Sequence, residues 1–494
     1  MSHVAIVGAG LGGIAAAVRL AGAGHRVTLL EKNDRPGGKV NVVEAEGFRF
    51  DTGPSMVTLP GVLSDTFRAA GRRMEDYISL RPLDPICRYR FADGTYLDTS
   101  SNLPRLVSEV GNLAPSEVTR LFKFLAYTRT IFERAGPGLL LRERSNLREL
   151  LVRNTLDTLR INSHLSMHIA VRRFFKDPRL VQLFEYYAGH DGSSPYKAPA
   201  NLSLLPYIEL VGGGWYVERG LYCMVEALMR VAQELGVNFQ PNCEVAEVTI
   251  APRSGWRGAR VTGVRFRAGG GLAADSVVVN ADPMYAYPTL VPEQFRDRRL
   301  SRRMDDLEPS CSAFMLLLGV RGQFPGLEHH NVFYSGDYRS ELEYIYDRRE
   351  PAPDPTIYVV NSSRSDPGLA PPGDSNLSVM VNAPALTPEV DWPALQAGYR
   401  ERILARLEAE GMPGLQERIV YEQIITPLDF EEKYHAWHGS IYGISSNSRR
   451  IASLRPPNRA SGVSNLYFVG GSVHPGGGIP FVLLSARSGA RLVK

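Results

Sequence analysis

The start of the chain has two short apolar runs, and the segment between them has the periodicity of a helix. Residues 4–7 form a continuous apolar run of the length typical of a strand buried in a parallel sheet. Residues 14–20 then show the pattern of a helix that ends near Gly22, and residues 27–30 form a second apolar run. This order of strand, helix and strand predicts a βαβ unit.

Similar apolar runs recur much later in the sequence. Those at residues 237–239, 244–250 and 276–280 have the character of strands, and we expect them to return to the domain that the βαβ unit begins. Residues 313–320 form the longest compact apolar stretch and fit a buried strand. The pattern therefore predicts an α/β protein whose first domain is assembled from separate pieces of chain.

The first turn of the βαβ unit is rich in glycine. The sequence GAGLGG places Gly8, Gly10, Gly12 and Gly13 there, in the order G-x-G-x-x-G, and Glu31 closes the second strand. Gly8 would make the tight turn, Gly10 would let a pyrophosphate approach, and Gly13 would let helix and strand pack. Glu31 would accept hydrogen bonds from ribose hydroxyls, which disfavours a cofactor with a 2′-phosphate. The spacing predicts a dinucleotide site.

Two further glycine-rich segments extend this pattern. The first lies shortly after Glu31 and contributes the candidate cofactor residues Lys32, Gly37, Gly38, Lys39, Gly53, Pro54 and Ser55. The second is GGSVHPGGGIP at residues 470–480, immediately before a helix-compatible apolar run, and it contributes the candidates Gly470, Gly471, Ser472, Gly478, Ile479 and Pro480. Glycine clusters of this kind mark backbone that a ligand approaches closely.

Together these segments resemble the signature of the superfamily of FAD-binding amine oxidases and carotenoid desaturases. With the GSSPYKAPA segment at residues 192–200, the chain is similar to the phytoene desaturase family over nearly its whole length. It departs from that family at Arg219, where a glycine is common. The resemblance implies FAD as the cofactor, with Val245 as a further contact. It also implies that the C-terminal glycine segment meets the flavin end of FAD.

The resemblance implies a Rossmann-like FAD domain of the glutathione-reductase type, interleaved with a discontinuous α+β substrate domain. Residues 100–210 show a helical pattern, which predicts a helical insertion, and residues 290–440 are rich in strand patterns. The expected FAD domain is built from residues 1–80, 213–288 and 445–494, and the expected substrate domain from residues 81–212 and 289–444.

Within this family the expected activity is desaturation of a polyene such as phytoene or dehydrosqualene. Two alternatives keep the flavin but change the chemistry, namely oxidation of a terminal methyl group and isomerisation. A remote alternative is a non-enzymatic carrier of prenylated proteins. The chain length of the substrate, C30 or C40, the number of double bonds and the choice of oxygen or a quinone as electron acceptor stay open.

Candidate substrate residues follow from the resemblance and from local composition. The polar candidates for catalysis are His190, Asp191, Arg172, Arg173 and His474. A structural or surface role is the alternative for the first four, and a role in orienting the loop is the alternative for His474. Aromatic residues are candidates for an apolar channel wall, and these are Phe174, Phe175, Phe184, Tyr186, Tyr187 and Tyr207. Ordinary core packing is an equally good explanation for each aromatic residue.

Composition and charge exclude several classes of protein. The net charge is +4 and no long basic block is present, which gives no reason to expect a nucleic-acid partner. The four cysteines have no metal-site spacing, so no metal is expected. The N-terminus lacks signal-peptide features and no apolar run reaches about 18 residues. Leucines and arginines at residues 138–160 predict an amphipathic helix, whose apolar face would meet either the protein core or a membrane surface. Because the resemblance implies a lipid-soluble substrate, we expect a cytoplasmic protein attached peripherally to the inner face of the membrane.

Overall fold

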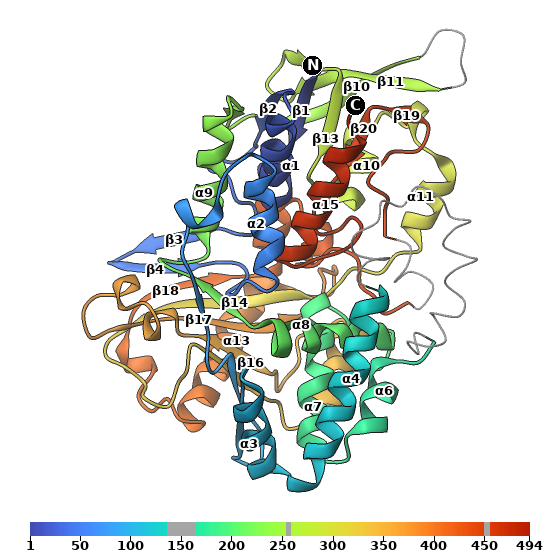
Figure 1. Cartoon of the computed structure of the whole chain (residues 1–494). Coiled ribbons are helices and arrows are strands. Elements are labelled where there is room, and N and C mark those ends of the chain that lie inside the picture. The colour runs from blue at the N-terminus through green and yellow to red at the C-terminus, as the bar shows by residue number, and fades with distance from the viewer. Residues whose placement is uncertain (136–163, 253–257, 449–454) are drawn as a thin grey trace.

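The computed structural model describes residues 1–135, 164–252, 258–448 and 455–494. A five-stranded parallel sheet lies near both chain ends in Figure 1, with the strand order β20-β13-β1-β2-β9. Its strands are β1 (His3–Val7), β2 (Arg26–Leu30), β9 (Asn238–Gln240), β13 (Ser276–Val279) and β20 (Leu466–Phe468). The predicted return of two distant segments, residues 237–239 and 276–280, to the first βαβ unit is confirmed.

Both faces of this sheet are buried, and alternate residues of β1 show why. Val4 and Ile6 pack into the cluster that the helices cover, whereas Ala5 and Val7 pack into the cluster beneath a second sheet. Because side chains alternate along a strand, a strand covered on both faces needs apolar residues at every position. This explains the continuous apolar run in the sequence.

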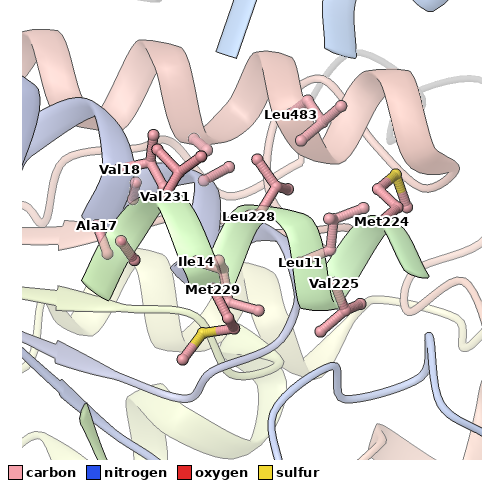
Figure 2. Close-up of a cluster of buried hydrophobic side chains, with 14 of the residues drawn as sticks. Leu11, Ile14, Ala17, Val18, Met224, Val225, Leu228, Met229, Val231 and Leu483 are labelled. Carbon is pink, nitrogen blue, oxygen red and sulfur yellow. The ribbon is translucent and has the colours of Figure 1, made fainter. Parts of the chain in front are cut away.

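Helices cover one face of the parallel sheet (Figure 1). In the core shown in Figure 2, Ile14 and Val18 of the first helix lie beside Leu228 and Leu483 from two other helices. The first helix is buried almost all round, as its apolar composition requires. The helices are α1 (Leu11–Gly22), α2 (Pro60–Arg68), α9 (Tyr222–Glu234) and α15 (Ile479–Leu492).

The opposite face packs against a small second sheet with the order β10-β11-β12, in which β19 also pairs with β11. Its strands are β10 (Val245–Pro252), β11 (Ala259–Phe266), β12 (Gly271–Ala273) and β19 (Val463–Ser464), and α10 (Pro283–Leu290) and α11 (Arg298–Asp305) lie nearby. The predicted strand at residues 244–250 exists, but it belongs to this sheet and not to the parallel one.

A seven-stranded mixed sheet lies below the parallel sheet in Figure 1, with the order β18-β14-β17-β16-β15-β6-β7. Phe314 and Leu316 of β14 pack against α13 on one face, and Met315 packs towards Phe48 and Phe50 on the other. Its strands are β6 (Cys87–Arg90), β7 (Tyr96–Thr99), β14 (Ser312–Val320), β15 (His330–Phe333), β16 (Ile357–Val360), β17 (Ser375–Ala383) and β18 (Ile419–Ile425). Around them lie β3 (Val42–Ala45), β4 (Phe48–Asp51), α12 (Tyr338–Glu343), α13 (Trp392–Ala409) and α14 (Pro427–Tyr434).

The predicted helical insertion is present over its described part and has an aromatic core. Phe124, Phe175 and Phe184 pack against one another there, with ring centroids 4.6 to 5.2 Å apart. Its helices are α3 (Leu103–Leu113), α4 (Val118–Ala135), α6 (Met167–Phe174), α7 (Pro178–Tyr186) and α8 (Leu204–Gly212), and a ribbon of β5 (Leu80–Pro82) and β8 (Trp215–Val217) borders it. The amphipathic helix expected at residues 138–160 lies outside the described residues.

Candidate active site

A cavity of about 480 Å³ reaches from the turn after β1 to the helical insertion. Almost all the predicted cofactor residues line it, although they come from five separate stretches of the chain. They are Gly8, Gly10, Gly12, Glu31, Lys32, Gly37, Gly38, Lys39, Gly53, Pro54, Ser55, Val245, Gly470, Gly471, Ser472, Gly478, Ile479 and Pro480. The fold therefore brings the two glycine-rich ends of the sequence to one place.

Gly13 is the predicted cofactor residue that does not line the cavity. A Cβ atom at Gly13 would lie 2.0 Å from the carbonyl oxygen of Gly8. Glycine at this position lets α1 pack against the end of β1, which is the packing role that the motif predicts.

Asn280 joins the two glycine clusters and was missed from the sequence. Its Nδ2 donates to the carbonyl oxygen of Gly8 at 3.2 Å, and its Oδ1 lies only 2.5 and 2.9 Å from where Cβ atoms on Gly12 and Gly470 would be. Asn280 directly follows β13, so it stands at the carboxyl end of the parallel sheet, where ligands of such sheets bind. Its position directly after a strand of the parallel sheet was the signal by which the sequence could have identified it.

Two helices begin at the cavity without a side-chain cap. Gly10 is the N-cap of α1 and Gly478 is the N-cap of α15; neither helix has an acidic residue in its first turn. Their first amide groups and the positive ends of their dipoles are therefore available to a ligand that carries negative charge. A pyrophosphate and a reduced flavin ring both carry negative charge. The two helix N-termini therefore suit the two parts of FAD, and the cavity fits this cofactor.

Glu31 lies at one end of the cavity with both carboxylate oxygens engaged. Oε2 accepts from the backbone amide of Ala9 at 2.7 Å, and Oε1 accepts from the backbone and side-chain amides of Asn33 at 2.9 and 3.0 Å. Burial raises the pKa of this carboxyl and the hydrogen bonds oppose that rise. Oε1 already accepts two hydrogen bonds, whereas Oε2 accepts one and keeps a lone pair for a further donor, as ribose binding requires.

Lys39 and Asp282 are two buried ionisable groups on the cavity wall. Lys39 Nζ donates to the carbonyl oxygens of Ser440 and Ile441 at 2.8 and 3.1 Å, and burial lowers its pKa to about 8, so it stays protonated at pH 7. Asp282 accepts from the Ser472 hydroxyl at 2.9 Å, and burial raises its pKa. Asp282 is a second cavity residue that sequence reasoning missed.

The far end of the cavity is mainly apolar and lies between the helical insertion and the seven-stranded sheet. Its wall includes Tyr186, Leu205, Ile208, Met315 and Met380. Of the aromatic wall candidates, Tyr186 is the one on this lining, whereas Phe174, Phe175 and Phe184 pack around Phe124, Tyr187 bonds Glu209 and Tyr207 packs on Phe132. The sequence could not distinguish residues of the cavity wall from residues of the hydrophobic core, because both positions use aromatic side chains.

The polar candidates for catalysis are dispersed. His190 lines the cavity, and burial lowers its pKa to about 4, so it is neutral at pH 7. Asp191 lies behind the lining and pairs with Arg455 at 2.9 Å.

The other candidates also lie outside the cavity lining. The side chains of Arg172 and Arg173 are exposed to solvent on α6. His474 is buried within the C-terminal glycine segment. The arginines are exposed because they occupy the polar face of an amphipathic helix.

Comparison with known proteins agrees with this geometry. The family model described as flavin containing amine oxidoreductase matches residues 11–494. A 4,4′-diapolycopene oxygenase from Methylomonas sp. is 38% identical over 98% of this chain and 96% of its own length. A zeta-carotene-forming phytoene desaturase from Myxococcus xanthus is 37% identical over 98% of this chain and 92% of its own length.

A solved structure shows the same fold. The crystal structure of an oxidoreductase from Methanosarcina mazei matches with a TM-score of 0.66 at 18% identity, over 98% of this chain and 99% of the other. The predicted α/β architecture, FAD cofactor and family resemblance are thereby confirmed. The chain belongs to the flavin-containing amine oxidoreductase family, in its carotenoid desaturase-like group, and is an FAD-dependent oxidoreductase.

Proposed function

We propose that the enzyme is a carotenoid desaturase that introduces double bonds into a polyene such as phytoene or dehydrosqualene. The observation that carries this proposal is the continuity of the cofactor cavity with an apolar end lined by Tyr186, Ile208, Met315 and Met380. A hydrocarbon offers nothing to hydrogen-bond, so an apolar wall is what its recognition requires. The names of the relatives support the same substrate class.

We assign the cofactor contacts residue by residue. Glu31 takes the ribose hydroxyls, the first amides of α1 take the pyrophosphate, and the segment from Gly470 to Pro480 takes the flavin end. Bound FAD supplies the two-electron oxidation by accepting a hydride. The protein orients the substrate and keeps water from the reacting carbons through the apolar walls of the cavity.

A second candidate is oxidation of a terminal methyl group of a carotenoid. The relative named as a diapolycopene oxygenase is as similar to this chain as the relative named as a phytoene desaturase, at 38% and 37% identity. Both reactions begin from a polyene held against the flavin. They differ in the product, which gains either a double bond or an oxygen atom.

Expression in carotenoid-producing cells tests the two candidates. In cells that accumulate phytoene or dehydrosqualene, the enzyme is expected to produce coloured polyenes with more conjugated double bonds, identified by chromatography and mass. A second set of cells that accumulates fully desaturated carotenoids tests for oxygenated products. If the pigments are unchanged in the first set and oxygenated products appear in the second, the oxygenase would replace the desaturase as the proposed function. Unchanged pigments in both would contradict the proposal.

We further propose that the helical insertion docks on a membrane, from which a lipid-soluble substrate enters. Phe122 of α4 and Ile169 of α6 are 47% and 43% exposed, and the two helices pack together. Exposed basic side chains accompany them, namely Lys123, Arg172 and Arg173. No helix among the described residues is long and apolar enough to cross a bilayer. Exposed apolar side chains beside basic groups are suited to attachment to one face of a membrane. Oxygen or a membrane quinone would then accept the electrons.

Vesicle flotation tests this docking surface. With vesicles of anionic lipid, the double variant F122S/I169S is expected to bind at least about tenfold more weakly than the wild type, because two half-exposed apolar side chains no longer enter the lipid. The matched control is L395S/V420S, which removes two side chains of similar exposure, 44% and 40%, from α13 and β18. Equal flotation of the two variants would contradict the proposed surface.

A further inference from the structure

Glu209 places a carboxyl group in the apolar end of the cavity. It lies on α8, is 3% exposed and contributes to the cavity wall. The other described acidic residues of the lining belong with the predicted cofactor residues: Glu31 is one of them, Glu244 directly precedes Val245, and Asp282 accepts a hydrogen bond from Ser472. Burying a carboxyl group in an apolar wall costs free energy unless hydrogen bonds or opposite charges compensate it. A functional role would explain why Glu209 is there.

The position of Glu209 relative to the flavin end of the site follows from the packing of its neighbour. Ile208 belongs to the apolar cluster that Phe481 contacts, and Phe481 directly follows the segment from Gly478 to Pro480. The N-terminus of α15 and α8 therefore face the same part of the cavity. Glu209, the next residue of α8, lines the same cavity as Ile479 and Pro480 at the start of α15.

The contacts of Glu209 leave half of its carboxyl free. Tyr187 Oη donates to Oε1 at 2.7 Å, which fixes the orientation of the group. The structure shows no hydrogen bond from a described residue to the second oxygen, Oε2. A carboxylate that is held by one oxygen and open at the other has the geometry of a proton acceptor.

No cation faces Glu209 among the described residues. Burial raises its pKa to about 7, and the Tyr187 hydrogen bond opposes that rise. The titratable groups that face it are Tyr187, Cys87, Tyr89 and Tyr358; burial raises the pKa of each, so all are neutral around pH 7. Glu209 is therefore free to change between its charged and neutral forms near neutral pH, as a general base should.

We propose that Glu209 is a catalytic residue that accepts the proton lost by the polyene, an inference that rests on the proposed desaturase function. Two C–H bonds on adjacent carbons break. One hydrogen leaves as a hydride to the flavin; the other leaves as a proton to Oε2 of Glu209, and its bonding electrons form the new π bond. The carboxylate becomes a carboxylic acid, which later returns the proton to solvent, so atoms and electrons balance.

Anaerobic reduction of the bound flavin by a polyene, followed by stopped-flow absorbance across pH, tests this role. In the wild type the rate is expected to rise as the pH passes about 7, because the charged form is the acceptor. E209Q should slow flavin reduction about 100-fold and remove the pH dependence. The matched control is E185Q, which neutralises another buried glutamate of the helical insertion that bonds His168 at 2.6 Å and does not line the cavity. It should keep the wild-type rate and profile.

Y187F gives an independent test that keeps the carboxyl. Loss of the hydroxyl that donates to the charged form raises the pKa of Glu209, so the midpoint of the rate profile should move to higher pH. An infrared measurement on substrate-free protein gives a readout that needs no turnover. The carboxylic acid band that E209Q removes should disappear from the wild type as the pH rises through about 7.

The outcomes separate the two proposals. If no polyene reduces the wild-type flavin, the desaturase function fails and the assignment of Glu209 fails with it. If the wild type is reduced and E209Q keeps its rate and pH profile, the assignment alone fails. A midpoint that Y187F leaves unchanged also overturns the assignment.

Discussion

Replacing Gly471 by leucine is expected to abolish flavin binding while leaving the fold intact. A Cβ atom at this position would lie 3.5 Å from Val482 and 3.6 Å from Gly477, which are ordinary contact distances. The protein therefore has room for the start of a side chain, and the remaining atoms of leucine would enter the cavity that Gly471 lines. We expect flavin binding to weaken at least about 100-fold, because the cofactor and the side chain compete for one space.

The ratio of flavin to protein after purification measures this effect, and circular dichroism with thermal unfolding of the flavin-free protein measures the fold. G471A is the matched control, since its single methyl group meets neighbours at ordinary distances and should keep most of the flavin. Gly478 offers a less clean test because its φ of +93° favours glycine whatever the space around it. Full flavin occupancy in G471L would contradict the placement of the cofactor.

The cofactor half of the cavity was predictable because its signals are local in sequence. The turn from Gly8 to Gly13, the acid at Glu31 and the glycine segment before α15 each combine a residue type with an adjacent strand or helix. Each such combination fixes a backbone geometry by itself. The fold then only has to bring these preformed pieces together, which the parallel sheet does.

The substrate half was not predictable because its residues matter through distant contacts. Glu209 and Met315 reach the cavity only through the packing of α8 and β14. Arg172 was a catalytic candidate with a surface role as the alternative, and the structure places its side chain on the exposed face of α6, outside the cavity lining.

The position of Arg219 illustrates how structure explains a departure from the family pattern. This residue replaces a common glycine, and its φ of +67° lies in the left-handed region that glycine prefers. Its side chain is exposed and its backbone amide donates to Asp366 at 2.7 Å. The backbone geometry is therefore kept although the glycine is lost, and the charged side chain is not part of the cavity lining.

Replacing Gly13 by alanine is expected to damage the fold itself, with or without flavin. The added methyl group would lie 2.0 Å from the backbone carbonyl oxygen of Gly8, so β1 and α1 would have to separate by more than 1 Å to reach ordinary contact. Overpacking of this kind costs about 3 kcal/mol of unfolding free energy. Alanine regains about 1 kcal/mol through its higher helix propensity. We expect a net loss of about 2 kcal/mol, measured by denaturant unfolding of the flavin-free protein.

The control for this substitution is G61A. Gly61 lies in the first turn of α2, and no atom lies within 4 Å of the position that a Cβ atom on it would take, so alanine there should raise stability by about 0.5 kcal/mol. The contrast with Gly471 separates two uses of glycine in one site. G13A should lower the stability of the flavin-free protein, whereas G471L should leave it unchanged and lose the flavin. A G13A protein as stable as the wild type would contradict the packing role of Gly13.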